Sequence, residues 1–224
     1  MRKIVCFIMA LTMMALATPV ANASDPAVDA VQKRYAAIKT MRAEFTQKLI
    51  HKESGNTEER KGVLYFAKPL KVLWETQSPI PEILLVTPEA IWNAFPDEDM
   101  AYKYPPELSD DSGGIVRVVT GQSALNKDFT IDNEGVENGL TRLTLFPNKP
   151  TQSLTEAELM VDAKTGLIKS VKILDFYYNQ NIITFTSQAT DVAIPDATFT
   201  FTPAKNMKVE DRTKSEAANN PLLQ

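Results

Sequence analysis

The chain has 224 residues, 44% of them hydrophobic, and its 24 basic and 28 acidic residues give a formal net charge of −4. An acidic chain without a basic block argues against nucleic acid or anionic lipid head groups as the main partner. The chain has a single histidine and a single cysteine. These are too few to ligate a zinc ion, and most catalytic nucleophiles would have no histidine to act as their base.

Residues 1–23 have the pattern of a cleaved secretory signal peptide. Arg2 and Lys3 precede an apolar run that closes on Ala21-Asn22-Ala23, which is a charged region, a hydrophobic region and an A-x-A cleavage site. A transmembrane anchor is the alternative, but the run is short and Pro19 near its end favours cleavage. We therefore expect an exported protein in which no later segment crosses a membrane.

Cleavage at this site changes the composition of the mature chain. It removes the only cysteine, Cys6, so the mature domain has no disulfide and depends on its hydrophobic core. It also removes two basic residues and no acidic one, which leaves 22 basic against 28 acidic residues and a net charge of −6.

The first mature element is predicted to be a helix over residues 25–40. Asp25 is a suitable N-cap and Pro26 a suitable first helical residue. Four apolar residues recur at helical spacing and form one stripe: Val28, Val31, Tyr35 and Ile38.

The period then changes from helical to alternating, which predicts strands. Residues 41–53 alternate apolar and polar side chains and predict a strand with one solvated face. The next run, GVLYFAKPLKVLWE (62–75), is strand-like but contains Lys68, Pro69 and Lys71. Because proline gives up a ladder donor, we interpret this run as two strand segments bent at Lys68-Pro69.

The rest of the chain predicts one short helix and many strands. Further strands are expected at 83–87, 90–95, 100–105, 128–134, 139–147, 155–192 (with turns at 162–166 and 179–181) and 197–203, and a short helix at 113–125. The pattern predicts an α+β fold, a large curled antiparallel sheet with helices over one mouth. We expect one domain over residues 24–213 and a disordered tail over 214–224.

No constellation of catalytic or metal-ligating residues stands out. His51 lies among lysines without carboxylate or cysteine partners at ligand spacing, so a surface role is expected. The acids at 97–99 and 110–111 are contiguous, which is typical of solvated loops rather than of a calcium loop or a catalytic pair. Nucleotide and hydrolase motifs are absent from the sequence, so we expect a binding or carrier protein without a cofactor.

The apolar residues of the mature chain allow two interpretations. The first is an ordinary packed core. The second is a concave sheet whose inner face holds a hydrophobic ligand beneath helices that act as a lid, since curled sheets recurrently bind lipids.

The ordered motifs resemble the LolA family of periplasmic lipoprotein carriers along almost the whole mature chain. They are the first helix, FTQK (45–48), the set Gly62, Lys68, Pro69 and Trp74, the run EILLVTPEAIW (82–92), and ATFTFTPAKNMKVED (197–211). Two turns depart from the family pattern: an Asp-Gly turn is replaced by residues 87–90, and a PP-x-G turn by residues 203–206.

This resemblance implies an unclosed, strongly curved antiparallel β-barrel with helices across its mouth. It implies a periplasmic carrier whose hydrophobic cavity takes the acyl chains of lipoproteins released by an inner-membrane ABC-type complex. The cargo then passes to the outer membrane, to an acceptor lipoprotein if one exists. We expect a monomer that hydrolyses no nucleotide and binds no nucleic acid.

The resemblance also suggests where the site lies. The family arginine that hydrogen-bonds the lid helices is matched by Lys68, which offers a compact ammonium instead of a planar fork. We expect Tyr35 and Ile38 to underlie the lid. The expected cavity residues are Val72, Trp74, Leu85, Ile115 and Val119, each of which is otherwise an ordinary core residue.

Three other functions remain open from the sequence. A periplasmic envelope-stress sensor of the same superfamily keeps the fold, although such proteins usually carry a second domain. A carrier of other lipids, such as glycolipids, is the next alternative, and an enzyme is the most distant.

Overall fold

The computed structural model describes residues 25–107 and 125–213. The expected signal peptide (1–23), the expected tail (214–224) and nearly all of the expected second helix (113–125) lie outside these residues. Leu125 is described and begins the short helix α4, Leu125–Asp128.

All twelve strands of the described chain belong to one sheet. Its spatial order is β12-β6-β5-β4-β3-β2-β1-β11-β10-β9-β8-β7. The strands are β1 Thr40–Ile50, β2 Thr57–Ala67, β3 Lys71–Ser78, β4 Glu82–Val86, β5 Ile91–Phe95, β6 Met100–Tyr104, β7 Phe129–Glu137, β8 Leu140–Pro147, β9 Glu156–Asp162, β10 Leu167–Leu174, β11 Gln180–Thr190 and β12 Lys208–Asp211. Neighbouring strands are antiparallel except β12, which pairs parallel to β6.

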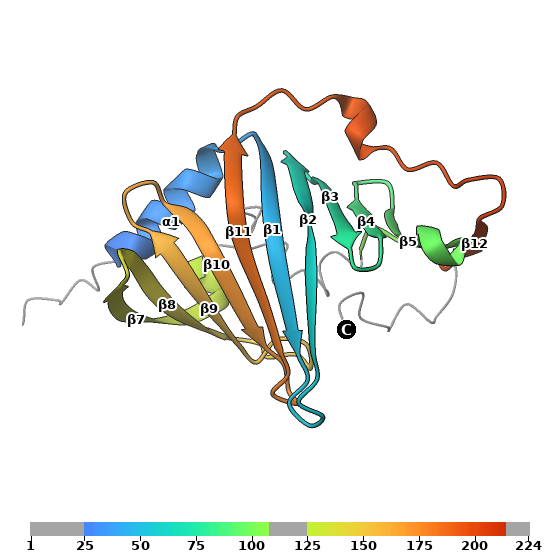
Figure 1. Cartoon of the computed structure of the whole chain (residues 1–224). Coiled ribbons are helices and arrows are strands. Elements are labelled where there is room, and N and C mark those ends of the chain that lie inside the picture. Colours follow the sequence, from blue (N-terminus) through green and yellow to red (C-terminus); the bar gives the residue numbers. More distant parts are fainter. Residues whose placement is uncertain (1–24, 108–124, 214–224) are drawn as a thin grey trace, which may run out of the picture.

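The sheet is strongly curved and unclosed, because its edge strands β7 and β12 do not pair with each other (Figure 1). Helix α1, Pro26–Ala37, lies against the half of the sheet that holds β7 to β11. The expected fold class, an α+β unclosed, curved antiparallel sheet with helices at its mouth, is confirmed, with α1 as the long helix among the described residues.

The cap and the apolar stripe predicted for α1 are also confirmed, although the helix ends at Ala37 and not at residue 40. The Asp25 carboxylate accepts hydrogen bonds from the backbone N–H of Ala27 and Val28, and Pro26 occupies the first turn. All four residues of the apolar stripe are buried: Val28, Val31, Tyr35 and Ile38. In β1 the expected alternation places Met41, Ala43, Phe45 and Gln47 on the buried face.

The run 62–75 forms two strands of one hairpin, as the proline indicated. β2 ends at Ala67 and β3 begins at Lys71, so Lys68, Pro69 and Leu70 form the turn. Pro69 therefore lies outside the ladder, where its missing N–H costs nothing.

Two predictions on the β10–β11 turn and the C-terminal segment are wrong. The turn expected at 179–181 lies at Asp175–Asn179, where the Asp175 carboxylate accepts hydrogen bonds from the N–H groups of Tyr177 and Asn179. This local side-chain bonding fixes the turn ahead of the Asn-Gln-Asn sequence. The strand expected at 197–203 is a 3₁₀ helix, η2 (Asp196–Phe199), followed by chain outside the ladder.

Residues 192–207 form a segment, here called the C-terminal strap, that runs from β11 across the molecule to β12 (Figure 1). Its Phe201 ring lies 5.2 Å from that of Trp92, and its Asp196 pairs with Lys71 at 2.9 Å. The strap thus packs on β3 and β5 through aromatic and ionic contacts.

Candidate functional site

The inner face of the sheet, defined here as the face on which α1 packs, carries the hydrophobic core. A single cluster of buried apolar residues joins α1 to strands from both halves of the sheet. Side chains alternate between the two faces along a strand, and residues paired across neighbouring strands lie on the same face. The strand pairings therefore show which other residues lie on the inner face.

On β1 to β6 these pairings arrange the inner face in transverse rows. The row nearest the β2–β3 turn is Met41, Phe66, Val72, Val86, Ile91 and Tyr104. The second row is Ala43, Leu64, Trp74, Leu84, Asn93 and Tyr102, and the third is Phe45, Gly62, Thr76 and Glu82. The first row is entirely apolar or aromatic and buried, whereas polar groups enter in the second and third rows.

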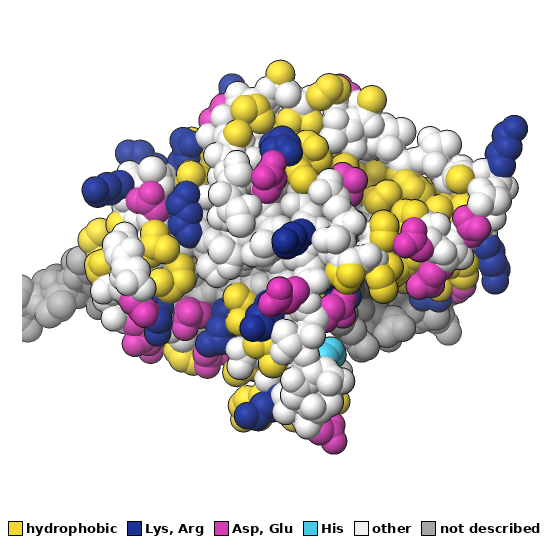
Figure 2. Space-filling view, in the orientation of Figure 1, with side chains coloured by type: hydrophobic (Ala, Val, Ile, Leu, Met, Phe, Trp, Pro, Cys, Tyr) yellow, Lys and Arg dark blue, Asp and Glu magenta, His cyan; other side chains and the backbone are white. Residues whose placement is uncertain are grey.

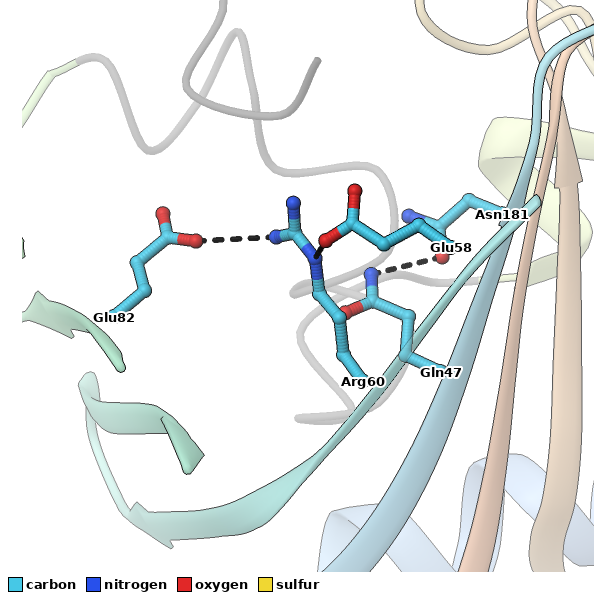
Figure 3. A network of polar contacts seen from close by, with 5 residues as sticks. All are labelled: Gln47, Glu58, Arg60, Glu82 and Asn181. Atoms are coloured by element: carbon cyan, nitrogen blue, oxygen red, sulfur yellow. Dashed lines mark hydrogen bonds and ion pairs between the residues drawn. The ribbon is translucent and has the colours of Figure 1, made fainter. Parts of the chain in front are cut away.

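The far end of this face is a polar network (Figure 3). Arg60 on β2 donates to Glu58 at 2.6 Å and to Glu82 of β4 at 3.1 Å. Beside it, Gln47 donates to the side-chain oxygen of Asn181 at 3.0 Å. The inner face therefore grades from apolar near α1 to charged and hydrogen-bonded at the opposite end.

Gly62 shapes the middle of this face by leaving space for two aromatic rings. A Cβ at Gly62 would lie 2.6 Å from the Phe45 ring and 2.0 Å from the Glu75 carbonyl oxygen. With no side chain there, the Phe45 ring lies 4.2 Å from the Trp74 ring, centroid to centroid. The glycine at the start of the run thus allows an aromatic pair across β1 and β3.

The C-terminal end of α1 is held by the β2–β3 turn. The Lys68 ammonium donates to the carbonyl oxygens of Tyr35, at 3.0 Å, and of Ala36. These belong to the last turn of α1, whose carbonyls have no partner within the helix and favour a cation. The Lys68 backbone N–H also donates to the Lys39 carbonyl, which ties this turn to the junction between α1 and β1.

The last turn of α1 is also held by the Tyr35 side chain. Its hydroxyl accepts the backbone N–H of Ile168 at 3.3 Å, at a point where β10 no longer pairs with β11. Burial raises the pKa of the Tyr35 phenol to about 12, against the smaller lowering effect of the Ile168 hydrogen bond.

The N-terminal end of α1 is held by Asp25. Its carboxylate accepts from the Asn133 amide of β7 at 2.7 Å, in addition to the helix N–H groups. Partial burial raises the pKa of Asp25, but the hydrogen bonds from Asn133, Ala27 and Val28 outweigh it, and the pKa lies below the ordinary 3.8. Helix α1 is thus anchored at both ends, by Asp25 at the first and by Tyr35 and Lys68 at the second.

The predicted cavity residues fall on both faces of the sheet. Val72 and Trp74 share the inner face; Val72 is 1% exposed, whereas Trp74 is partly buried at the edge of the cluster. Leu85 is buried but pairs with Leu73 and Trp92, so it lies on the opposite face, with the strap residue Phe201 against Trp92. Ile115 and Val119 lie outside the described residues.

The predicted lid and gate residues lie close together. Tyr35 and Ile38 are buried under α1 in the core cluster, and Lys68 binds the same end of the helix. Sequence reasoning missed Leu84, Phe45 and Tyr102 on the inner face. Leu84 pairs with Trp74 and therefore lies on the inner face. The sequence could not show this, because the uninterrupted apolar run ILLV has no alternation from which the face of each residue could be read.

A separate surface cavity of about 470 Å³ lies between the β1–β2 and β10–β11 turns. It is lined by His51, Glu53, Ser54, Tyr177 and Asn179, and His51 is exposed, as expected. Within residues 25–107 and 125–213, no group of acidic, histidine or cysteine side chains could hold a metal ion, and no helix is long and apolar enough to span a membrane.

One surface of the molecule is shown in Figure 2. Basic and acidic side chains are interspersed over it, without a broad field of one sign, and hydrophobic side chains gather where β3, β4 and β5 lie in Figure 1.

Comparison with known proteins adds a family and a fold. The model of the family described as "Outer membrane lipoprotein carrier protein LolA" matches residues 36–202. An outer-membrane lipoprotein carrier protein of Chromobacterium violaceum is 25% identical over 190 residues, covering 84% of this chain and 89% of the relative. One from Cupriavidus necator is 26% identical over 213 residues, covering 93% and 97%.

A solved structure agrees with the fold. The crystal structure of an uncharacterized conserved protein from Thermus thermophilus superposes with a TM-score of 0.56 at 14% identity, covering 83% of this chain and 97% of that one. At this identity the likeness concerns the fold alone.

Proposed function

Because the chain belongs to the LolA family of outer membrane lipoprotein carrier proteins, we propose that it binds the acyl chains of lipoproteins on the inner face and carries them through the periplasm. The observation that supports this most directly is the gradient of the inner face, from the buried apolar row next to the β2–β3 turn, where Lys68 holds the end of α1, to the Arg60 network. An acylated protein has the same polarity: apolar chains at one end and a polar head at the other.

The energetics require a closed apolar site. Each CH₂ of an acyl chain exposed to water costs about 0.8 kcal/mol, so a water-soluble carrier must shield the chains. The rows nearest α1 are filled by the protein's own side chains, with Val72 at 1% exposure. Because α1 belongs to the same core cluster, we propose that loading moves α1 away from this core and that release returns it.

Lys68 is the contact best placed to set that equilibrium. It is an exposed ammonium on the last turn of α1, where a cation contributes about 0.3–1 kcal/mol. We propose that the Lys68 ammonium binds the carbonyls at the end of α1 less tightly than an arginine guanidinium would. An incoming acyl chain then displaces α1 from Lys68 more easily.

The finer steps extend this proposal. The carrier would be exported by the cleaved peptide 1–23, receive its cargo from an inner-membrane ABC-type releasing complex, and deliver it to the outer membrane, with or without an acceptor lipoprotein. Residues 24–213 would form the single carrier domain.

The central test is release of a diacylated lipoprotein from proteoliposomes that contain the transporter and ATP. The mature chain should move the lipoprotein into the soluble fraction as a one-to-one complex, and a non-acylated form should not bind. If no more lipoprotein becomes soluble than with an unrelated periplasmic protein, the carrier function is wrong.

Two adjacent residues provide a matched pair of variants. Trp74→Glu places a charge on the partly open inner face, and Leu73→Glu places the same charge one residue away on the opposite face. Trp74→Glu should lower acyl binding at least tenfold more than Leu73→Glu, by the cost of desolvating a carboxylate. Val72 is a poorer choice, because a charge at its buried position disrupts packing.

A further inference from the structure

The inner face contains one buried polar group whose acceptor is unused. Asn93 on β5 is 7% exposed, and its side-chain oxygen Oδ1 has no donor among residues 25–107 and 125–213. Its partners across the neighbouring strands are Leu84 and Tyr102, and Ile91, two residues away on the same face, is buried in the core. Leaving a buried acceptor unbonded is costly, and native structures rarely do so without a reason.

The other buried atoms without a partner differ from this one. In the described chain they are Arg34 Nε and Arg142 Nε, which belong to guanidinium groups whose terminal nitrogens bond to Thr190 and Glu137. The amides of Gln47 and Asn181, on the same inner face, bond to each other. Asn93 thus stands out as a buried amide acceptor without a donor, between Leu84 and Tyr102.

Its position in the gradient indicates what kind of donor would fit. Asn93 lies in the second row, in line with Trp74, with the apolar first row on one side and Thr76 and Glu82 in the row on the other. An acyl chain lying toward α1, with its head toward the Arg60 network, would place its linkage near this row. An amide linkage has an N–H to donate, whereas an ester linkage has none.

We propose that Asn93 accepts a hydrogen bond from the amide N–H that joins an acyl chain to its polar head, and so selects amide-linked over ester-linked chains. This inference rests on the proposed function, because it requires an acyl chain on the inner face. Asn93 would thus supply a specificity that apolar packing cannot, because an apolar protein surface does not distinguish the N–H of an amide from the oxygen of an ester.

The test uses two ligands that differ only at this atom, N-ethyldodecanamide and ethyl dodecanoate. Their affinities for the mature chain are measured by displacement of a fluorescent fatty acid. In Asn93→Leu the ratio of amide to ester affinity should fall by about tenfold, because the desolvated N–H loses its acceptor. In Asn148→Leu, which removes an exposed amide outside the inner-face rows and the Arg60 network, the ratio should stay at the wild-type value.

The outcomes separate this inference from the function on which it rests. If both ligands bind and Asn93→Leu leaves their ratio unchanged, the role of Asn93 is wrong and the acyl-binding function stands. If neither ligand displaces the probe from any variant, both are wrong. Asn93→Leu should also raise the thermal unfolding midpoint; a lowered midpoint would mean that the amide is already bonded within the protein and would overturn the proposal.

Discussion

The side-chain ammonium of Lys68 lies 3.0 Å from the carbonyl oxygen of Tyr35 and also bonds that of Ala36. A turn between two strands thus closes the last turn of a helix 32 residues earlier in the chain. Lys71, at the other end of the same turn, instead pairs with Asp196 of the strap. The two lysines that interrupt this apolar run therefore hold different segments in place.

Replacing Lys68 should loosen α1. Lys68→Leu removes the cation from the helix C-terminus, worth about 0.3–1 kcal/mol, so amide hydrogen exchange in the second half of α1 should accelerate about two- to fivefold. Lys68→Arg should slow this exchange.

The matched control for this experiment is Lys71→Leu, which changes the same turn without touching α1. It should leave exchange in α1 at the wild-type rate. Equal acceleration by the two variants would mean that the turn, and not the Lys68 contact, governs the helix.

Alkaline pH should destabilise the protein through Tyr35. Its folded pKa of about 12 lies above the ordinary value of 10.0, so the stabilisation is complete below pH 10 and is lost as pH rises toward 12. In Tyr35→Phe this loss should disappear, while at neutral pH the variant should be less stable by about 1 kcal/mol because the Ile168 N–H loses its acceptor. Urea unfolding across this range measures both effects; an identical alkaline slope in the two proteins would refute the assignment.

Acid should weaken the N-terminal anchor of α1. The pKa of Asp25 is lowered in the folded state, so its contribution is present above the ordinary value of 3.8 and is lost as pH falls through the folded pKa. Asp25→Ala should cost about 1 kcal/mol at neutral pH, and its stability should fall less steeply on acidification. Asp25→Asn is the comparison, since it keeps a cap acceptor but binds no proton; an acid dependence equal to that of the wild type would contradict the role of Asp25.

Gly62 should tolerate no side chain. Gly62→Ala places a Cβ against the Glu75 carbonyl and the Phe45 ring, and overpacking of this kind costs about 1–3 kcal/mol. Gly139→Ala is the comparison, because Gly139 has a φ of +79° and open space around it, so alanine there should cost about 1–2 kcal/mol through its backbone alone. If Gly62→Ala costs less than Gly139→Ala in denaturant unfolding, the Phe45–Trp74 pair does not depend on the glycine.

Much of this architecture could be predicted because local patterns match tertiary burial. The stripe of α1 and the alternation of β1 needed no knowledge of their partners, and Pro69 marked the turn between β2 and β3. Leu85 could not be assigned in the same way. A run without polar residues has no visible period, so only the register with Trp92 and Leu73 shows its face.

The C-terminal region shows a different limit of sequence reasoning. The alternation of ATFTFTP is that of a strand, yet Phe199 and Phe201 are used to pack the strap against Lys71 and Trp92. Tertiary contacts here override a strand-like pattern. The unpaired oxygen of Asn93 was equally invisible, since a single asparagine within AIWNAF gives no sign that its side-chain oxygen accepts no hydrogen bond.

The anchors of α1 have a geometric consequence for the whole sheet. Twelve helical residues form a rod about 18 Å long, whose ends are fixed to Asn133 on the edge strand β7 and to Lys68 on the β2–β3 hairpin. The helix therefore keeps a fixed distance between two points of the sheet, one on β7 and one on the β2–β3 hairpin. The sheet cannot flatten or tighten much between these points without breaking one of the two attachments. A change in the curvature of the sheet therefore requires a change in the docking of α1.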